Sequence, residues 1–336
     1  MLRRIFLALP AAAAAQTGQT SAKKAVSKKG SAAKTAVRAA LSAKERVNRV
    51  LRGGDADRPP FTFWYHFGLE KYPFDRHVKA TLEFHRKFRT DLVKVMSDYP
   101  YPKPKGKWHE LKVDGNPFPE QIKALDAIND GLAGRAHFVE TLFNPWTVAE
   151  KLSSKEEVLR MKNENPQGLL AALEIIAESQ THHARKAVEA GASGIFLAIA
   201  NAQEGVLSRA DYAKFSEPFD RLILKGVESA PLNTLHLHGD KVYMDLFYSG
   251  WPAAAINYSA HATGVGIAEV RQRFSGLIIG GVDEVKYRTL TEAVLKQQWQ
   301  MAGDAAGKRF VLAPGCSVPD ETTDEEMLRL TKAIKA

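Results

Sequence analysis

The stretch GLLAALEIIAESQTHHARKAVEA (residues 168–190) is followed, after a short turn, by GIFLAI (residues 194–199). In the first segment apolar residues recur at spacings of three and four, as at Leu170, Leu173 and Ile176, and this pattern predicts an amphipathic helix. The second segment is a short apolar run typical of a strand buried on both faces. A helix followed by a fully buried strand is the unit of a parallel sheet, so this stretch decides the fold class.

The same alternation extends over most of the chain. Helical patterns such as Arg209–Ser229 and Leu290–Ala302 separate short β-rich runs. The expected strands are Phe61–His66, Leu92–Ser97, Phe138–Leu142, Gly194–Ile199, Asn233–His238, Ala254–Tyr258, Leu277–Gly280 and Phe310–Ala313. Eight such units predict an α/β protein with a single (β/α)8 TIM barrel. A doubly wound open sheet is the alternative, but no Gly-x-Gly-x-x-Gly follows an early strand to support a dinucleotide site.

Size and composition are compatible with one barrel. The chain has 336 residues, of which 45% are apolar and 25% charged, as in ordinary soluble globular proteins. This length could hold two average domains, but a barrel of this kind runs to about 250 residues as one unit. The sequence also predicts an N-terminal helix at about Ser42–Leu51, with Ser42 as its N-cap, and an inserted loop at Tyr99–Pro117.

The net charge of +9 belongs to the N-terminal part of the chain. Residues 1–48 carry ten Lys or Arg and one acidic residue, whereas the remaining residues carry 37 charges of each sign. The basic character is therefore that of a tail and not of the folded part. This distribution excludes nucleic acid as the partner that the overall charge would suggest.

The N-terminal tail resembles a bacterial twin-arginine export signal. Arg3-Arg4 precedes an apolar stretch of small residues that ends before Gln16, and Pro10 interrupts this stretch, which is too short to span a membrane. We expect a signal peptide at residues 1–15, a basic Ala/Lys-rich disordered linker at 16–41 and the barrel at 42–336. The expected location is periplasmic, with no stable membrane insertion after the signal is removed. The alternative is a cytoplasmic enzyme with a basic extension.

The most specific chemical signal is a set of two histidines and the only cysteine. His236 and His238 are two positions apart on a predicted strand, so their side chains project to the same face. Cys316 follows the apolar run Phe310–Ala313. Two imidazoles and a thiolate form a three-ligand site with one open position, as in catalytic zinc centres. The alternative is a pair of strand-end histidines beside an inert thiol.

Polar and aromatic residues also gather where the predicted strands end. Active sites of TIM barrels lie at the carboxyl ends of the strands. We expect Asp98 and Glu204 to orient the substrate or to hold the histidine ligands. The residues expected to bind a small-molecule substrate are Trp64, Tyr65, His66, Asn201, Tyr258 and Asp283. Taken singly, such residues are more often packing residues or helix caps.

Several motifs in order resemble the uroporphyrinogen decarboxylase (URO-D) family, a set of such barrels that also contains cobalamin-linked methyltransferases. The resemblance covers roughly residues 45–335. Met96-Ser97-Asp98 resembles the Ser-Asp segment of the decarboxylases, in which the resemblance implies an Asp that contacts the pyrrole nitrogens. The other similar motifs are Asn144-Pro145-Trp146-Thr147, Ala190-Gly191-Ala192 with Leu207-Ser208, and Gly280-Gly281-Val282-Asp283.

Two departures favour the methyltransferase branch. The decarboxylases carry an Arg-x-Ala-Gly-Arg motif for the substrate carboxylates, and this chain has no arginine at residues 64–68. A porphyrinogen with eight carboxylates needs guanidinium groups for bidentate capture. The methyltransferases bind zinc through a His-x-Cys-Gly segment and a later Cys. His236-Leu237-His238-Gly239 and Cys316 stand at the matching places, with His238 instead of the first Cys.

The resemblance therefore implies a zinc-dependent methyl or alkyl transferase that activates a thiol or a similar group. A corrinoid-linked methyl donor, supplied by a corrinoid protein, is the implied partner, and a homodimer is a further option. The first alternative is a cofactor-independent uroporphyrinogen decarboxylase of porphyrin biosynthesis, in which Asp98 would stabilise a protonated pyrrole. The second is an exported barrel that binds a small molecule without catalysis.

Overall fold

The central element is one sheet of seven parallel strands. The computed structural model describes residues 40–96 and 99–335, and the predicted signal peptide, most of the predicted linker and Asp98 lie outside these ranges. Neighbouring strands are consecutive in the chain, in the order β1 to β7. The strands are β1 Leu92–Val95, β2 His137–Phe143, β3 Ile195–Ile199, β4 Thr234–Leu237, β5 Ala255–Tyr258, β6 Leu277–Val282 and β7 Phe310–Pro314.

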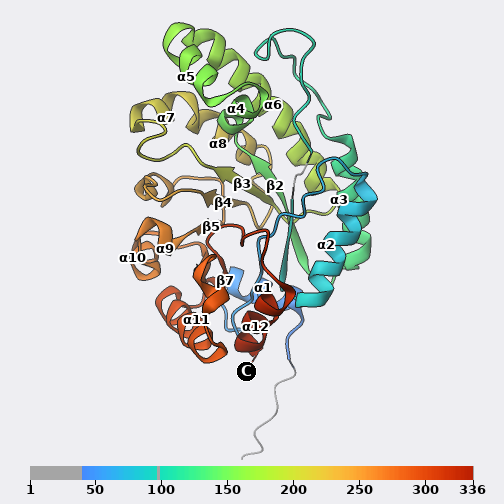
Figure 1. Cartoon of the computed structure of the whole chain (residues 1–336), viewed down its shortest axis with the longest axis vertical. Coiled ribbons are helices and arrows are strands. Elements are labelled where there is room, and N and C mark those ends of the chain that lie inside the picture. The colour runs from blue at the N-terminus through green and yellow to red at the C-terminus, as the bar shows by residue number, and fades with distance from the viewer. Residues whose placement is uncertain (1–39, 97–98, 336) are drawn as a thin grey trace, which may run out of the picture. The chain divides into compact units, whose positions relative to one another are not determined.

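Helices connect the strands and surround the sheet, as right-handed β–helix–β crossovers require (Figure 1). Their bounds are α1 Ala43–Leu51, α2 Phe74–Phe88, α3 Pro119–Leu132, α4 Pro145–Leu152, α5 Lys155–Glu164, α6 Pro166–Glu189, α7 Arg209–Phe215, α8 Glu217–Lys225, η1 Met244–Phe247, α9 Ala260–Thr263, α10 Ile267–Arg273, η2 Lys286–Thr289, α11 Glu292–Ala306 and α12 Asp324–Lys335. No helix among residues 40–96 and 99–335 is both long and apolar enough to cross a membrane.

Alternation along the strands separates two packed faces. Side chains such as Val139, Phe196 and Ile279 form one buried cluster on the inner face of the sheet, together with Val47 and Val50 of α1. Alternate residues of the same strands belong to a larger cluster that packs against the surrounding helices. Because α1 shares the inner cluster and its Asn48 contacts His137 at the start of β2, this helix covers the inner face at the amino ends of the strands. The carboxyl ends of the strands, on the opposite side, are where polar side chains of the inner face lie.

The prediction of eight strands is wrong at the first one. Residues 61–66 form no strand and make only an isolated parallel bridge between Phe61 and Leu312 of β7. Thr62 N donates to Leu312 O at 3.0 Å, and Asp91 N donates to Phe61 O at 2.8 Å, so this segment lies between β7 and β1. Leu312 N donates to Pro60 O, and the next donor of a parallel ladder would be residue 314, which is a proline without an N–H group. The architecture of the described residues is TIM-barrel-like, with seven strands and no eighth strand that closes the sheet.

The other predicted elements are found within a few residues of their expected bounds. The remaining seven strands and the N-terminal helix are present, and Ser42 Oγ accepts a hydrogen bond from Glu45 N as the N-cap of α1. The helix predicted over residues 209–229 is two helices, α7 and α8. The interruption at Ser216 lies two residues before Pro218, whose nitrogen has no N–H to donate to the Lys214 carbonyl and whose ring would crowd it in a continuous helix.

A buried ion network holds the segment between β7 and β1. The Asp91 carboxylate accepts from Arg46 Nη1 and Arg58 Nη1, both at 2.6 Å, and from Phe61 N at 3.0 Å. Asp91 and Arg46 are almost fully buried. Since a buried charge is tolerated only when it is paired and hydrogen-bonded, removing this carboxylate would leave two guanidinium groups without their common partner.

We therefore expect Asp91→Asn to lower the free energy of unfolding by about 3–5 kcal/mol, measured by urea denaturation followed by circular dichroism. The matched control is Asp55→Asn, because the Asp55–Lys308 pair is exposed and pairs of this kind contribute about 1 kcal/mol or less. Equal effects of the two substitutions would show that the Asp91 network does not hold the segment.

Candidate metal centre

The structure brings His236, His238 and Cys316 together at the carboxyl ends of β4 and β7. Cys316 Sγ lies 3.3 Å from His238 Nδ1 and 3.8 Å from His236 Nε2. One ligand atom from each residue lies within 4.8 Å of the other two, and these three residues are the only such His, Cys or carboxylate group among the described residues. His236 is buried, whereas His238 is exposed, so the cluster is open to solvent on one side.

Asn257 of β5 fixes the orientation of the buried histidine. Its amide nitrogen donates to two backbone carbonyls, Ile279 O at 2.9 Å and Pro314 O at 3.2 Å. Carbonyl oxygens only accept hydrogen bonds, so the remaining Asn257 Oδ1 faces His236 Nδ1, at 2.7 Å, and accepts from it. His236 Nδ1 therefore carries a proton, and the lone pair of neutral His236 lies on Nε2, toward Cys316.

The residues around Cys316 favour its thiolate form. Burial is the largest effect and raises the pKa of the Cys316 thiol, but the hydrogen bond with His236 and the nearby positive charges hold this pKa below its ordinary value. One of these charges is Lys94, an inner-face residue of β1 whose Nζ lies 5.0 Å from the centroid of the Phe196 ring. Phe196 in turn stacks on His236, with ring centroids 4.9 Å apart.

The loop that carries Cys316 depends on a glycine. An added Cβ at Gly315 would lie 2.2 Å from the Cα atom of Ser259, a contact with backbone that cannot be relieved by a side-chain rotation. Gly315 N also donates to Val282 O. The absence of a side chain at Gly315 therefore lets the end of β7 approach the residues after β5 and β6 closely, which places the next residue, Cys316, beside the histidines.

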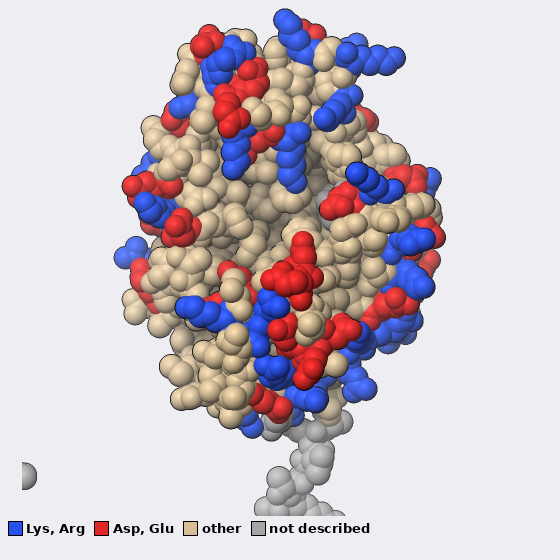
Figure 2. Space-filling model, viewed as in Figure 1, with Lys and Arg blue, Asp and Glu red and all other residues tan. Residues whose placement is uncertain are grey.

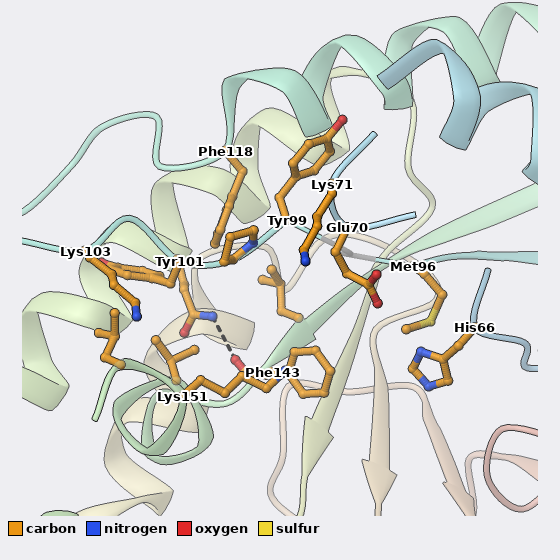
Figure 3. A pocket seen from close by; sticks show the side chains of 15 residues that line it. His66, Glu70, Lys71, Met96, Tyr99, Tyr101, Lys103, Phe118, Phe143 and Lys151 are labelled. Carbon is orange, nitrogen blue, oxygen red and sulfur yellow. Dashed lines mark hydrogen bonds between the residues drawn. The ribbon is translucent and has the colours of Figure 1, made fainter. Parts of the chain in front are cut away.

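A cavity of about 440 Å³ lies at the ends of β1 and β2. Figure 3 shows His66 and Met96 at one end of this cavity and Tyr101 and Lys103 at the other. The face of the molecule drawn in Figure 2 is hollowed at its centre, with basic side chains over the upper rim of the hollow and acidic side chains below it. The cavity has the volume of a small-molecule site. Its lining does not include the three cluster residues.

Trp64, Tyr65 and His66 were expected to bind substrate. Of these three residues, only His66 lines this cavity. Burial and the nearby Lys94 charge lower the pKa of His66, so its imidazole is neutral at pH 7. Trp64 is buried in the inner face and packs on Phe196. Tyr65 stacks on Phe84 of α2, and its hydroxyl donates to the Asp320 carbonyl.

The other expected site residues lie apart from the cluster. Glu204 is exposed and faces Lys241 at 3.9 Å, while the partner of the His236 ring is Asn257. Tyr258 is buried among apolar residues on the outer face of the sheet. Asp283 Oδ1 accepts from two backbone N–H groups at the start of η2, which is a capping contact. The position of Asp98 lies outside the described residues.

Asn201 belongs to a buried polar network at the carboxyl ends of β2 and β3, called here the mouth of the sheet together with the other strand ends. Asn144 Nδ2 donates to Asn201 Oδ1 at 2.8 Å and to Ser216 Oγ at 3.0 Å. The same network includes Asp220, whose Oδ2 accepts from Ser216 Oγ and from the Tyr212 hydroxyl. The network ties the ends of β2 and β3 to α7 and α8, so it supports the mouth without lining the cavity.

Asn257 and Lys94 were not singled out from the sequence as functional residues. A lysine inside the apolar run LVKV, at an inner-face position, is a signal that could have been found, because a buried cation requires a partner or a function. For Asn257 the signal is its register, since it lies directly beside His236 on the neighbouring strand. That register is a property of the folded sheet.

Comparisons with known proteins agree with the barrel-like fold. The family model described as uroporphyrinogen decarboxylase (URO-D) matches residues 95–336. A uroporphyrinogen decarboxylase from Trichodesmium erythraeum is 25% identical and covers 88% of this chain and 97% of its own. Another, from Pseudomonas fluorescens, is 26% identical, and the match covers 66% of this chain and 67% of that protein.

Solved structures show the same fold. A methyltransferase from Methanosarcina mazei superposes with a TM-score of 0.70 at 19% identity, over 88% of this chain and 98% of that one. A B12-independent methionine synthase from Shewanella superposes with a TM-score of 0.51 at 10% identity, over 83% and 93% of the two chains. At these identities the likeness concerns the fold alone.

The chain belongs to the uroporphyrinogen decarboxylase family, because the family model covers well over half of its residues. Membership of this family indicates an enzyme, and the sequence resemblance to the family is thereby confirmed. The reaction that this member performs is a separate question, and its answer depends on the site.

The Asp220 carboxyl group predicts a pH dependence of stability. Complete burial raises its pKa from 3.8 to about 7, although three hydrogen bonds oppose the shift. Between these two pH values the folded chain holds a proton that the unfolded chain has released, so stability should fall as pH rises through this window. Below about pH 4 and above about pH 7 the contribution should be constant.

We expect the free energy of unfolding of Asp220→Asn, relative to the natural chain, to increase between pH 4.5 and 7 by on the order of 1 kcal/mol per pH unit. Urea denaturation at several pH values measures this difference. Asp126→Asn, at an exposed position of α3, controls for the loss of one carboxylate. A difference that is the same at all pH values would contradict the raised pKa.

Proposed function

We propose that this protein is a zinc-dependent transferase that moves a methyl or other alkyl group to a thiol or a similar nucleophile. The observation that carries the proposal is the convergence of His236, His238 and Cys316 around one point at the open end of the sheet. Family membership supports an enzyme, and the sequence resemblance to the zinc methyltransferase branch supports the type of reaction.

The donor set fits zinc in number, chemistry and spacing. Two neutral imidazoles and one thiolate are common zinc ligands, and three protein ligands leave the fourth position of a tetrahedron open. Zinc bonds of about 2.0–2.1 Å to nitrogen and 2.3 Å to sulfur place tetrahedral donors roughly 3.3–3.7 Å apart. The sulfur-to-nitrogen distances of 3.3 and 3.8 Å lie close to this range.

When bound, zinc supplies a Lewis-acidic position at which a substrate thiol loses its proton at neutral pH. The residues of the chain prepare that position. Asn257 keeps the His236 lone pair on Nε2, and Phe196 stacks on the His236 ring. Burial raises the pKa of the Cys316 thiol, but the hydrogen bond with His236 and nearby positive charges hold this pKa below its ordinary value. The exposed side of His238 leaves the open position accessible to a substrate from the mouth.

Loss of one ligand should reduce zinc binding strongly. For Cys316→Ser and for His238→Ala we expect the affinity for zinc to fall by more than about 100-fold, since removing a direct ligand exceeds the 10–100-fold cost of losing an outer partner. Metal analysis after dialysis, with competition by a chromophoric chelator, measures this. His261→Ala is the matched control, because His261 is an exposed histidine after β5 that lies outside the cluster. Full zinc occupancy in Cys316→Ser would show that Cys316 is not a zinc ligand and would contradict the proposed site.

Asn257→Ala should weaken zinc binding by about 10–100-fold without removing a ligand, because His236 then loses the acceptor that sets its tautomer. The same competition assay, performed on folded protein, gives the affinity. Asn233→Ala controls for the removal of a buried, hydrogen-bonded amide, since Asn233 bonds only backbone groups at the amino end of β4. If both variants bind zinc equally well, the proposed role of Asn257 is wrong.

A cofactor-independent decarboxylase is the second candidate, supported by the names of the related proteins. The cationic residues that line the cavity are Lys71, Lys103 and Lys151, and none of the described lining residues is an arginine. Lysine cannot offer the bidentate fork that suits carboxylates. Turnover of uroporphyrinogen by metal-free protein would favour the decarboxylase over the transferase. A small-molecule carrier without catalysis, a corrinoid protein as methyl donor, and export by the twin-arginine route remain proposals from the sequence.

A further inference from the structure

The cavity at the ends of β1 and β2 contains a buried polar atom without a partner. Gln180 of α6 lines this cavity and is only 1% exposed. Its Nε2 donates to the Phe143 carbonyl oxygen at 2.7 Å, which fixes the orientation of the amide. Its Oε1 has no hydrogen-bond partner. A buried acceptor left unpaired is costly, so an N–H or O–H group of a ligand would stabilise it.

Lysines give the same cavity a positive charge. Among the described residues that line it, Lys71, Lys103 and Lys151 accompany one carboxylate, that of Glu70. Figure 3 shows Lys103 at the end of the cavity that is remote from His66. Lys151 Nζ lies over the Phe143 ring, 3.1 Å from its centroid, which draws the ammonium group to the cavity wall. An oxyanion would therefore be bound by these two ammonium groups.

Aromatic rings supply the remaining walls. Tyr101 and Phe118 lie on one side of the cavity with their rings 5.8 Å apart, edge to face, and Phe143 lies on another. Such walls favour a flat, unsaturated ligand body, which buries apolar area and makes ring contacts.

We propose that this cavity binds a flat aromatic or heteroaromatic acid, with its oxyanion on Lys103 and Lys151 and an N–H or O–H group on Gln180 Oε1. The inference rests on the proposed transferase function, for which it supplies the substrate class.

Calorimetric titration with three probes tests the proposal. 4-Hydroxybenzoate carries both features, 4-methylbenzoate lacks the donor, and 4-hydroxybenzamide lacks the charge. We expect the natural chain to bind 4-hydroxybenzoate about fivefold more tightly than the methyl analogue and about tenfold more tightly than the amide. Lys151→Gln and Lys103→Gln should each weaken benzoate binding several-fold and leave the benzamide affinity unchanged. Lys225→Gln, an exposed position on α8, should leave all three affinities unchanged.

Gln180→Met should abolish the difference between 4-hydroxybenzoate and 4-methylbenzoate, while the affinity for the methyl probe reports whether the cavity keeps its shape. Absence of saturable 4-hydroxybenzoate binding to the natural chain would overturn the proposal, as would binding that is indifferent to Lys151→Gln and Gln180→Met. The zinc content of these variants should equal that of the natural chain, and Cys316→Ser should still bind the probe. Failure of zinc binding would therefore count against the proposed function alone.

Discussion

The site depends on one buried amide. Asn257 contacts three neighbouring parts of the sheet at once, through His236 of β4, the Ile279 carbonyl of β6 and the Pro314 carbonyl of β7. Because its two amide hydrogens are used by backbone groups, its oxygen can only accept, and the tautomer of His236 follows. The same bond to Pro314 fixes the chain two residues before Cys316. The positions of two of the three cluster residues thus depend on a side chain that belongs to neither.

The metal cluster and the cavity, both at the carboxyl ends of the strands, differ in the charged groups that surround them. At the cluster, His236 is buried, Cys316 is partly buried and His238 is exposed. Among the described lining residues of the cavity there are three lysines and one carboxylate, and His66, whose pKa is lowered by burial and by the Lys94 charge, lies at one end. Burial raises the pKa of Cys316, but the hydrogen bond with His236 and nearby positive charges, Lys94 among them, hold it below its ordinary value.

The sequence predicted the parts of this structure that follow from local pattern. Seven strands, the capped helix α1 and the shared face of His236 and His238 follow from periodicity. The segment at Phe61 has the composition of a strand, but Pro314 of β7 lacks the N–H group that would extend the ladder beyond Thr62. Asn257 and Gln180 escaped notice because their importance comes from register and from atoms distant in the chain. Similarly, Tyr258 ends a strand but faces outward, since alternation from Asn257 leaves it on the other side.

The arrangement of cations bears on the choice between the two family chemistries. A substrate with carboxylates around its whole periphery would need bidentate cations on all sides of its pocket, whereas the described lining of this cavity of about 440 Å³ offers three lysines and no arginine. A small acid with one charged end needs fewer cations and fits a cavity of this volume. The His236, His238 and Cys316 cluster occupies the ends of β4 and β7, so the charged and reactive ends of such a substrate are bound by different strands. A transferase needs this division, because one end of the substrate must stay fixed while the other exchanges a group.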